Sequence, residues 1–329
     1  MAKSESRKKR PGRPTYKETL DLLDEEVALL RRSLGGLPRA VEADQILRSI
    51  WIDDVHHSTA IEGNTMTRAQ VEDLVEKRRA SASLIEVLEV EGYARAADWV
   101  YRNAADFSGV PTEVLSEIHR QAMELVWAVD PPPTDDRPGQ WRSTGVSVRG
   151  LNVSLPVSIS ADLRAWSDST VNLVGNHPLE HVAIHHAALE KIHPFIDGNG
   201  RVGRLVLNFM LLQRGYPPAV IHVDQRPRYL RALRSADGGN WRPLTEVVAR
   251  AVSGALNRFL IPGLAGKAKL VPLSSLAAQG PYSAAYLRQL ALAGRLRTIR
   301  EGRLWLSSRA WLDEYISSRD PRGTRDQRG

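Results

Sequence analysis

Apolar positions recur at helical spacing over most of the chain, so the sequence predicts a mainly α-helical protein. Leu20, Leu23, Val27 and Leu30 follow the period of about 3.6 residues that places side chains on one helix face. A second helix is expected to end at Gly63-Asn64. Five further helices each begin at or beside a Pro, Gly or Thr, which are common helix-start residues. These are expected at 68–77, 113–126, 178–192, 199–214 and 244–259.

Two stretches depart from this helical pattern. In residues 141–158, β-branched and apolar positions flank Arg149-Gly150-Leu151-Asn152, which predicts a short β-hairpin. Near the C-terminus, strands are expected at 296–299 and 303–306 around Glu301-Gly302. Helices expected at 274–278, 283–294 and 308–316 complete the order helix, turn, helix, hairpin, helix, which is typical of a winged helix-turn-helix domain.

Turn residues and composition divide the chain into segments. Pro262-Gly263 and Gly266 indicate a linker after the last long helix. The expected organisation is a basic disordered tail at 1–14, an N-terminal helical region at 15–110, a central core at 111–262, a winged helix-turn-helix domain at 267–318 and a basic tail at 319–329.

Charge is unevenly distributed along the chain. The net charge is +7, but residues 1–14 carry six Lys/Arg and one Glu, and residues 264–329 carry twelve Lys/Arg and five Asp/Glu. Basic ends can neutralise nucleic-acid phosphates, or can simply be solvated. The sequence contains no cysteine, no apolar run of membrane-spanning length and no secretory signal at the N-terminus. We therefore expect no membrane partner and a cytoplasmic location.

The segment from His193 to Arg204, HPFIDGNGRVGR, contains the strongest candidate for chemistry. Pro194 disfavours helix at the residue before it, so the preceding helix should end there. Gly198 and Gly200 allow a close approach of the backbone to a ligand. A helix beginning near Asn199 would direct free backbone N–H groups and the positive end of its dipole at an anion such as phosphate.

Charged side chains surround that predicted helix start. Arg201 and Arg204 are three residues apart, so they share a helix face and can clamp phosphate oxygens. Asp197 is a hard oxygen ligand of the kind Mg²⁺ prefers, and His193 is a titratable base. Each feature has an ordinary structural explanation alone. Together within twelve residues they predict a phosphate-binding loop with a base and a metal ligand.

This segment resembles the signature of the Fic family, H-x-F-x-[D/E]-G-N-G-R-x-x-R, at every fixed position, and the similarity extends over roughly residues 40–255. The resemblance implies a protein adenylyltransferase, a nucleotidyltransferase that uses ATP and Mg²⁺ to place AMP on a Ser, Thr or Tyr hydroxyl of a target protein or of itself. The hairpin would be the flap that aligns the target segment.

The resemblance also implies a role for each site residue. His193 would be the general base, and Asp197 would hold Mg²⁺. Gly198, Asn199 and Gly200 would form the anion hole, Arg201 would contact the inner phosphates and Arg204 the γ-phosphate. Tyr229 and Asp237 would contact adenine, although many members have Asn at the second of these positions.

Upstream, residues 58–64 read STAIEGN, which resembles the inhibitory pattern [S/T]-x-x-x-E-[G/N] found in some Fic proteins. In those proteins the Glu pairs with the second arginine of the signature. Here Glu62 would occupy the guanidinium of Arg204 that the γ-phosphate needs, and Ser58 would help to hold the helix in place. The ordinary alternative is a helix end with Glu62 facing solvent.

The C-terminal unit resembles excisionase-like winged-helix domains, which implies DNA as a partner. The residues expected at DNA are Tyr286, Arg288 and Gln289 on the second helix and Arg295, Arg297, Arg300 and Arg303 around the wing. His181 and His185 are spaced as zinc ligands can be, but no third ligand is evident and packing is the preferred interpretation.

Three functions remain open from the sequence. The first is a self-inhibited adenylyltransferase with a DNA-binding module. The second is a DNA-binding transcriptional regulator whose Fic domain senses nucleotide. The third is removal of AMP from a target, with Glu62 orienting a water. A homodimer and a monomer are both open.

Overall fold

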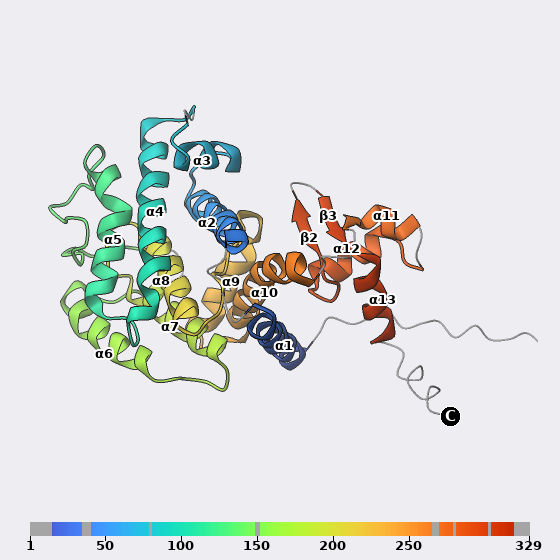
Figure 1. Cartoon of the computed structure of the whole chain (residues 1–329). Helices are drawn as coiled ribbons and strands as arrows, with labels where there is room; N and C mark the ends of the chain where they lie inside the picture. The colour runs from blue at the N-terminus through green and yellow to red at the C-terminus, as the bar shows by residue number, and fades with distance from the viewer. Residues whose placement is uncertain are drawn as a thin grey trace, which may run out of the picture. The chain divides into compact units, whose positions relative to one another are not determined.

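The structure is a computed structural model that describes residues 15–34, 41–78, 81–148, 152–264, 270–278, 281–301 and 304–318. The chain is mainly helical, as the sequence predicts (Figure 1). It divides into two compact units, one formed by Glu26–Leu260 and the other by Met1–Glu25 together with Ile261–Gly329. The tails predicted at 1–14 and 319–329 lie outside the described residues.

The larger unit is a helical assembly around one buried helix, α8 (Asn199–Gln213), in which every residue from Arg201 to Leu211 is buried. α8 packs against α7, α4 and α5, and α4 also lies along α5 (Figure 1). Because α8 is enclosed on several sides, its N-terminal turn is held in a fixed place. The other helices that begin in this unit are α2 (Val41–Ile61), α3 (Arg68–Val75), α4 (Leu84–Asn103), α5 (Thr112–Trp127), α6 (Ile159–Val171), α7 (Pro178–Ile192), α9 (Arg226–Asp237) and α10 (Arg242–Leu264), with short 3-10 turns η1 (Ala104–Asp106), η2 (Pro156–Ser158) and η3 (Val223–Gln225).

Capping residues fix the connections that surround α8. Thr67 and Ser83 each form a capping box, at the starts of α3 and α4 respectively. The carboxylate of Glu86 accepts hydrogen bonds from the backbone N–H groups of Thr65 (3.0 Å) and Ser83 (3.2 Å). One side chain therefore ties the segment that follows α2 to the first turn of α4.

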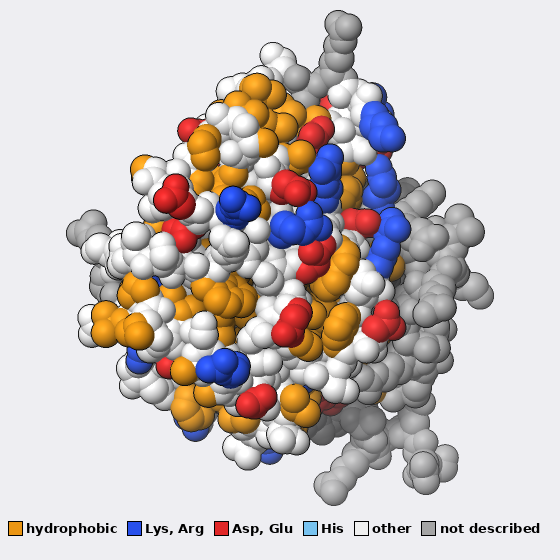
Figure 2. Space-filling view, turned by 90° about the vertical axis from the view of Figure 1, so that its left-hand side faces the viewer, with side chains coloured by type: hydrophobic (Ala, Val, Ile, Leu, Met, Phe, Trp, Pro, Cys, Tyr) orange, Lys and Arg blue, Asp and Glu red, His pale blue; other side chains and the backbone are white. Residues whose placement is uncertain are grey.

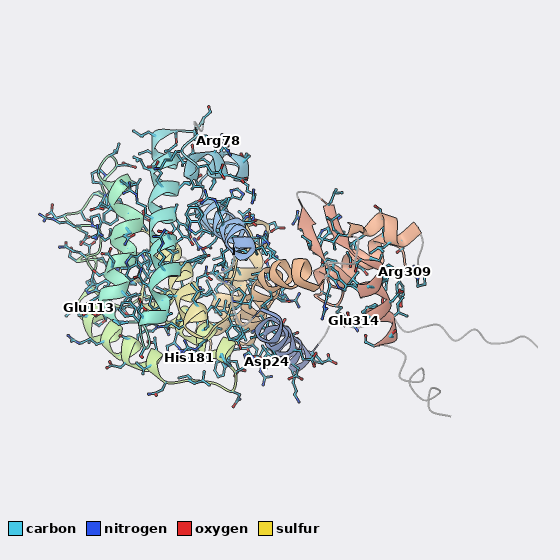
Figure 3. The ribbon with its side chains drawn as sticks, viewed as in Figure 1. Asp24, Arg78, Glu113, His181, Arg309 and Glu314 are labelled. Atoms are coloured by element: carbon cyan, nitrogen blue, oxygen red, sulfur yellow. The ribbon has the colours of Figure 1, made fainter. Side chains whose placement is uncertain are left out.

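The histidines of α7 are used for packing. His181 and His185 are buried, and Figure 3 places His181 among the helices. The Nδ1 atom of His181 accepts a hydrogen bond from the N–H of Val174 (3.1 Å). The Nε2 atom of His185 lies 3.0 Å from the Ser169 hydroxyl. Within the described residues, no group of three or more His, Cys, Asp or Glu side chains could hold a metal by itself.

The structure describes only the two flanks of the hairpin predicted at 141–158, and no extended strand forms in them. Only Val148 forms a β-bridge there, residues 149–151 lie outside the described part, and Pro156–Ser158 is the 3-10 turn η2. Leu155 and Val157 are 69% and 88% exposed, so these positions bury no apolar face. A two-stranded hairpin is marginal without such a face.

The smaller unit includes the first part of α1 (Tyr16–Leu34), and its described residues from 270 to 318 form three short strands and three helices. The sheet order is β1-β3-β2 and both pairs are antiparallel, with Val271 opposite Ser307 and Ile299 opposite Leu306. Leu287, Leu290 and Leu312 are buried in its core. The elements are β1 (Val271–Pro272), α11 (Leu273–Ala278), α12 (Ala284–Leu292), β2 (Ile299–Glu301), β3 (Leu304–Ser307) and α13 (Arg309–Ser317), the last of which carries Arg309 and Glu314 (Figure 3).

Three boundaries in this region differ from the prediction. The first strand begins at Ile299 rather than at Leu296, because Leu296 is buried in the core instead of pairing. β1 was not predicted, since two residues are too few to show alternation. α10 continues through Pro262-Gly263 to Leu264, where a linker was expected.

The surface of the larger unit mixes side chains of different kinds. On the face shown in Figure 2, acidic and basic side chains are interspersed with hydrophobic ones. Such a face exerts no strong field of one sign. Within the described residues, no helix combines the length and the hydropathy needed to cross a bilayer.

Candidate active site

The candidate site is the loop between α7 and α8. α7 ends at Ile192, and His193 adopts the left-handed conformation with φ 52° and ψ 61°. Its backbone N–H donates to the carbonyl of Leu189 (3.0 Å), which closes the last turn of the helix. A non-glycine residue in this conformation costs about 1 kcal/mol, so the surrounding structure must hold it.

Asn199 closes the loop upon itself. Its Oδ1 accepts from the N–H of Phe195 (2.9 Å), and its Nδ2 donates to the carbonyl of Phe195 (2.8 Å). Asn199 was predicted to belong to the anion hole. The structure gives it this framework role, in which both polar atoms of its amide hold the backbone of the loop.

His119 of α5 packs against the same loop, and it was not identified from the sequence. Its ring stacks on Phe195 with centroids 3.7 Å apart. Nδ1 accepts from the N–H of Gly139 (2.7 Å), so Nε2 carries the proton and donates to the carbonyl of Asp197 (3.1 Å). Burial lowers the pKa of His119 to about 3, which keeps the ring neutral in this role.

Arg142 is a second supporting residue that sequence reasoning missed. It is 2% exposed, and its guanidinium donates to the carbonyls of His193 (2.8 Å), Thr144 (2.8 Å) and Ser154. Its backbone N–H donates to the carbonyl of Pro194 (2.8 Å). Arg142 therefore connects the backbone of the candidate base to both arms of the segment that was predicted as a flap.

The His193 imidazole is suited to act as a base. Its Nδ1 lies 3.3 Å from the carbonyl of Glu190, a contact that places the proton on Nδ1 and leaves Nε2 free to accept one. Burial lowers the pKa of His193 below its ordinary value, which favours the neutral ring near pH 7.

The first turn of α8 has the geometry that the predicted anion site requires. Gly198 is its N-cap with φ 81°, and a methyl group there would overlap Met123. No side chain caps the turn, so its N–H groups remain available to an anion. Arg201 and Arg204 project from this turn with their side chains 6% and 5% exposed.

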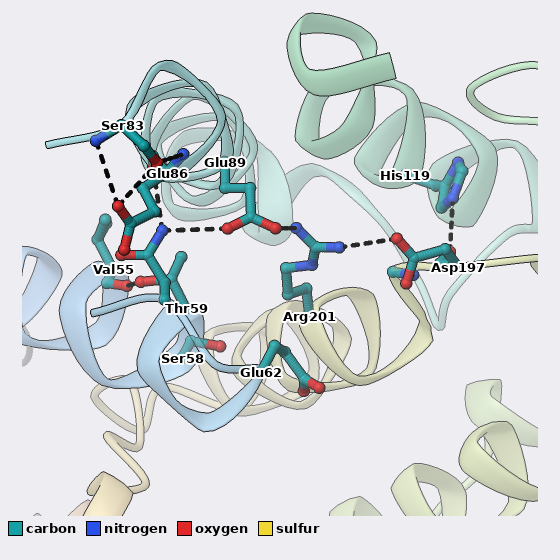
Figure 4. A network of polar contacts seen from close by, with 12 residues as sticks. Val55, Ser58, Thr59, Glu62, Ser83, Glu86, Glu89, His119, Asp197 and Arg201 are labelled. Carbon is teal, nitrogen blue, oxygen red and sulfur yellow. Dashed lines mark hydrogen bonds and ion pairs between the residues drawn. The ribbon is translucent and has the colours of Figure 1, made fainter. Parts of the chain in front are cut away.

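Asp197 is the exposed acidic group of the loop, with 60% of its side chain exposed. Its Oδ1 accepts from the N–H of Gly198 (2.6 Å), and its Oδ2 lies 3.2 Å from Nη2 of Arg201 (Figure 4). Because it is close to the first arginine and open to solvent, Asp197 can contribute one oxygen to a cation that a bound phosphate also holds.

Arg204 is held by the end of α2. Glu62 Oε1 lies 2.8 Å from Nη2 of Arg204, the Ser58 hydroxyl accepts from Nε (2.6 Å), and the Ser58 carbonyl accepts from Nη2 (2.9 Å). Burial alone would raise the pKa of Glu62, but the charge of Arg204 holds it below its ordinary value. The Glu62 side chain is 36% exposed, and in this structure its carboxylate pairs with Arg204.

Gly200 shows where the Glu62 carboxylate lies. A methyl group at Gly200 would overlap Glu62 Oε1 and approach Nη1 of Arg204. The carboxylate thus lies directly against the first turn of α8, at the place where helix geometry favours an anion. The predicted residues Gly200, Arg204, Glu62 and Ser58 are brought together at one point.

The two residues predicted at adenine are on α9, where Tyr229 interacts electrostatically with Arg204. Tyr229 is 1% exposed, and its hydroxyl is 2.7 Å from Nε2 of His186, within a hydrophobic cluster. Asp237 ends α9, and its Oδ2 is buried with no hydrogen-bond partner among the described residues. Burial raises the pKa of Asp237. Their contact with adenine stays a prediction.

The residues predicted at DNA lie on the smaller unit. Arg288 and Gln289 are exposed on α12, and Arg300 is exposed on β2. Tyr286 is half-buried beside Tyr282, with ring centroids 5.0 Å apart, and Arg297 lies 3.7 Å from Glu314. Arg295 is half-buried, and Arg303 lies outside the described residues. No described contact assigns these residues to DNA, so that role stays a prediction.

Comparison with known proteins agrees with this site. Residues 109–211 match the model of the Fic/DOC family. A protein adenylyltransferase Fic of Nematostella vectensis is 30% identical over 249 residues, which are 74% of this chain and 56% of that protein. The Drosophila melanogaster protein of the same name is 29% identical over 248 residues, which are 74% of this chain and 48% of that protein. The chain thus spans about half the length of the curated relatives it matches.

Solved structures share the fold. Fic-1 (aa134–508) from C. elegans superposes with a TM-score of 0.63 at 25% identity, over 74% of this chain and 71% of that one. A Fic family protein from Desulfovibrio desulfuricans G20 superposes with a TM-score of 0.58 at 22% identity, over 91% of this chain and 98% of that one. The sequence matches and the loop geometry lead to one conclusion: the chain carries a Fic domain of the Fic/DOC family.

Proposed function

We propose that this chain is a protein adenylyltransferase that transfers AMP from ATP to a protein hydroxyl, and that Glu62 holds it in a low-activity state. The observation that carries the proposal is the position of the Glu62 carboxylate against Gly200 and Arg204. An acidic side chain there occupies an anion site built from a helix N-terminus and a buried guanidinium. The name of the curated relatives supports the same activity.

The chemistry assigned to the chain is an in-line displacement at the α-phosphorus of ATP. The target hydroxyl oxygen forms a bond to this phosphorus, and the bond to the pyrophosphate oxygen breaks. His193 Nε2 takes the hydroxyl proton. The α8 N–H groups and the two arginines stabilise charge on the phosphates, so catalysis rests on positioning and electrostatics.

Magnesium fits the groups that are present. Mg²⁺ is usually held by one or two protein carboxylates together with substrate phosphates and waters. Asp197 supplies one exposed carboxylate beside the arginines, as this mode of binding requires. When bound, Mg²⁺ would neutralise phosphate charge. Asp197 would hold it at the loop while Arg201 orients the inner phosphates.

The test is incubation of the full chain with ATP labelled in the α-phosphate and Mg²⁺, comparing the parent, Glu62→Gly and His193→Ala in the Glu62→Gly background. We expect label on protein from Glu62→Gly, little from the parent and none from the His193→Ala combination. Mass spectrometry then identifies the transferred group and the Ser, Thr or Tyr that receives it.

The other readings predict different results. A nucleotide sensor would bind ATP but leave Glu62→Gly unlabelled. A removal activity would strip label from the Glu62→Gly protein when the parent is added. Either result would overturn the proposed function.

We also propose DNA binding by the smaller unit as a second activity. It is favoured by the exposed Arg288 and Gln289 on α12 and the exposed Arg300 on β2. The test is fluorescence anisotropy with duplex DNA over a range of salt concentrations, using Arg288→Ala and Gln289→Ala. Arg309→Ala serves as the control, because Arg309 is on α13 and pairs with Asp313 (3.0 Å). Equal binding by all variants would exclude this face.

A further inference from the structure

Arg201 is held by two carboxylates that come from different parts of the fold. Its Nη1 lies 3.3 Å from Oε1 of Glu89, and its Nη2 lies 3.2 Å from Oδ2 of Asp197 (Figure 4). The Arg201 side chain is only 6% exposed, so these contacts decide where its guanidinium stands. Nothing in the sequence pattern around residue 201 indicates Glu89, which is 112 residues away.

Glu89 is the more firmly fixed of the two carboxylates. It lies within α4, a twenty-residue helix that packs against α2, α5 and α8. Its side chain is 25% exposed, whereas that of Asp197 is 60% exposed on a loop. Glu89 can therefore hold Arg201 in place while Asp197 engages another partner.

Asn64 holds the second oxygen of Glu89. Its Nδ2 donates to Glu89 Oε2 (3.1 Å) and to the carbonyl of Glu86 (3.0 Å), and its Oδ1 accepts from the N–H of Met66 (3.1 Å). Asn64 is only two residues from Glu62, which pairs with Arg204. The short segment 62–64 thus reaches both arginines of the anion site, Arg204 directly and Arg201 through Glu89.

We propose that Glu89 is a positioning residue that fixes the Arg201 guanidinium for the inner phosphates of the nucleotide, and that Asn64 couples this position to the segment carrying Glu62. The proposal rests on the proposed function, since it assigns Arg201 to a nucleotide phosphate. An arginine has five N–H groups in a planar fork. Glu89 engages one end of the fork, and the remaining groups stay able to donate to phosphate.

The experiment measures equilibrium binding, so it does not depend on transfer of AMP. Calorimetry with ATP, ADP and adenosine is performed on Glu62→Gly and on the same variant with Glu89→Gln. Loss of one charge-assisted contact should weaken ATP and ADP by about fivefold to tenfold. Adenosine, which has no phosphate, should bind equally to both proteins. Tighter binding of ATP by the Glu89→Gln protein would mean that Glu89 competes with phosphate, and would overturn the proposal.

A double-mutant cycle separates positioning from a general loss of structure. In an Arg201→Ala background, Glu89→Gln should change ATP affinity no further, because its effect passes through Arg201. An equal loss in both backgrounds, or a parallel loss for adenosine, would make Glu89 merely structural. Glu91→Gln is the matched control on the same helix, and Glu91 forms no ion pair with Arg201. If Glu89→Gln does not fold, Glu89→Asp keeps the charge, shortens the reach and should give a smaller loss of the same kind.

Asn64→Ala tests the coupling to the inhibitory segment. It should weaken ATP and ADP by about twofold to threefold without affecting adenosine, since Glu89 keeps its charge but loses a support. Unchanged ATP affinity would overturn the coupling.

The two proposals can fail separately. Binding of ATP without any transfer of AMP would overturn the proposed function, and the ATP and ADP affinities would still test the role of Glu89. Failure of Glu62→Gly to bind any nucleotide would overturn both.

Discussion

Glu62 and Arg204 form an ion pair of 2.8 Å at the first turn of α8, between residues 142 positions apart in the chain. The arginine side chain is 5% exposed, and Ser58 engages it from the same helix turn. Breaking a pair of this kind without a replacement anion leaves a buried guanidinium without a counter-charge. Under the proposed function, a nucleotide phosphate would replace Glu62 at Arg204, so the nucleotide and Glu62 would compete for one guanidinium.

Removing only part of the contact between the end of α2 and Arg204 should give an intermediate level of AMP transfer. Ser58→Ala removes the hydroxyl that accepts from Nε of Arg204 but leaves the Ser58 carbonyl and Glu62 in place. Labelling by Ser58→Ala should therefore exceed that of the parent and fall below that of Glu62→Gly. Thr59→Ser is the control, because its hydroxyl can still donate to the Val55 carbonyl. A Ser58→Ala protein more active than Glu62→Gly would contradict this order.

The pH profile of transfer should reflect a base with a lowered pKa. Burial lowers the pKa of His193, so its neutral form persists to lower pH than for an ordinary histidine of about 6.5. In the Glu62→Gly protein, kcat should stay level from pH 8 to below 6.5 and then fall as the imidazole gains a proton. Nucleotide affinity over the same range separates binding from chemistry. A half-loss of kcat at pH 6.5 or above would exclude His193 as this base.

Arg142→Met should loosen the loop on both sides of His193, the proposed base. It would leave the carbonyls of His193, Thr144 and Ser154 without their donor. A buried unsatisfied carbonyl costs about 1–3 kcal/mol. These three hydrogen bonds are only partly buried, so urea unfolding should show a total loss of about 3 kcal/mol. Trypsin should also cleave within 143–155 faster. Arg137→Met, at an exposed position of the same loop, should change neither measurement.

Glu190→Gln should stabilise the protein only at higher pH. Burial raises the pKa of Glu190 to about 8, and its Oε1 has no hydrogen-bond partner among the described residues. Between the ordinary Glu value of about 4.3 and the raised value, the folded state binds more protons than the unfolded chain, so stability falls as pH rises.

A glutamine does not titrate, so Tm of Glu190→Gln minus Tm of the parent should increase steadily from pH 5 to pH 8.5. A Tm difference for Glu190→Gln that stays constant or shrinks with rising pH would show that Glu190 is ionised in the folded state.

Most helices were predictable because their signals are local. The α7 and α8 boundaries follow from Pro178, Pro194 and the glycines, which restrict the backbone at their own positions. No strand forms in the described part of the hairpin predicted at 141–158, where Leu155 and Val157 are exposed. The first strand near the C-terminus begins at Ile299 because Leu296 packs into a core instead of pairing. Whether a short segment forms a strand depends on the residues that pack against it, and its own β-propensity does not contain that information.

The sequence by itself determined the loop from His193 to Arg204, since a base, a carboxylate, a helix start and two arginines lie within a few turns of one another along the chain. Glu62 and Ser58 were reached only through a family resemblance. The tertiary structure alone decided that His119, Arg142 and Glu89 support the loop, at separations of 78, 51 and 112 residues from their partners. The physical reason is that local backbone geometry follows from neighbouring residues, whereas the partner of a buried polar group depends on which distant helices pack around it.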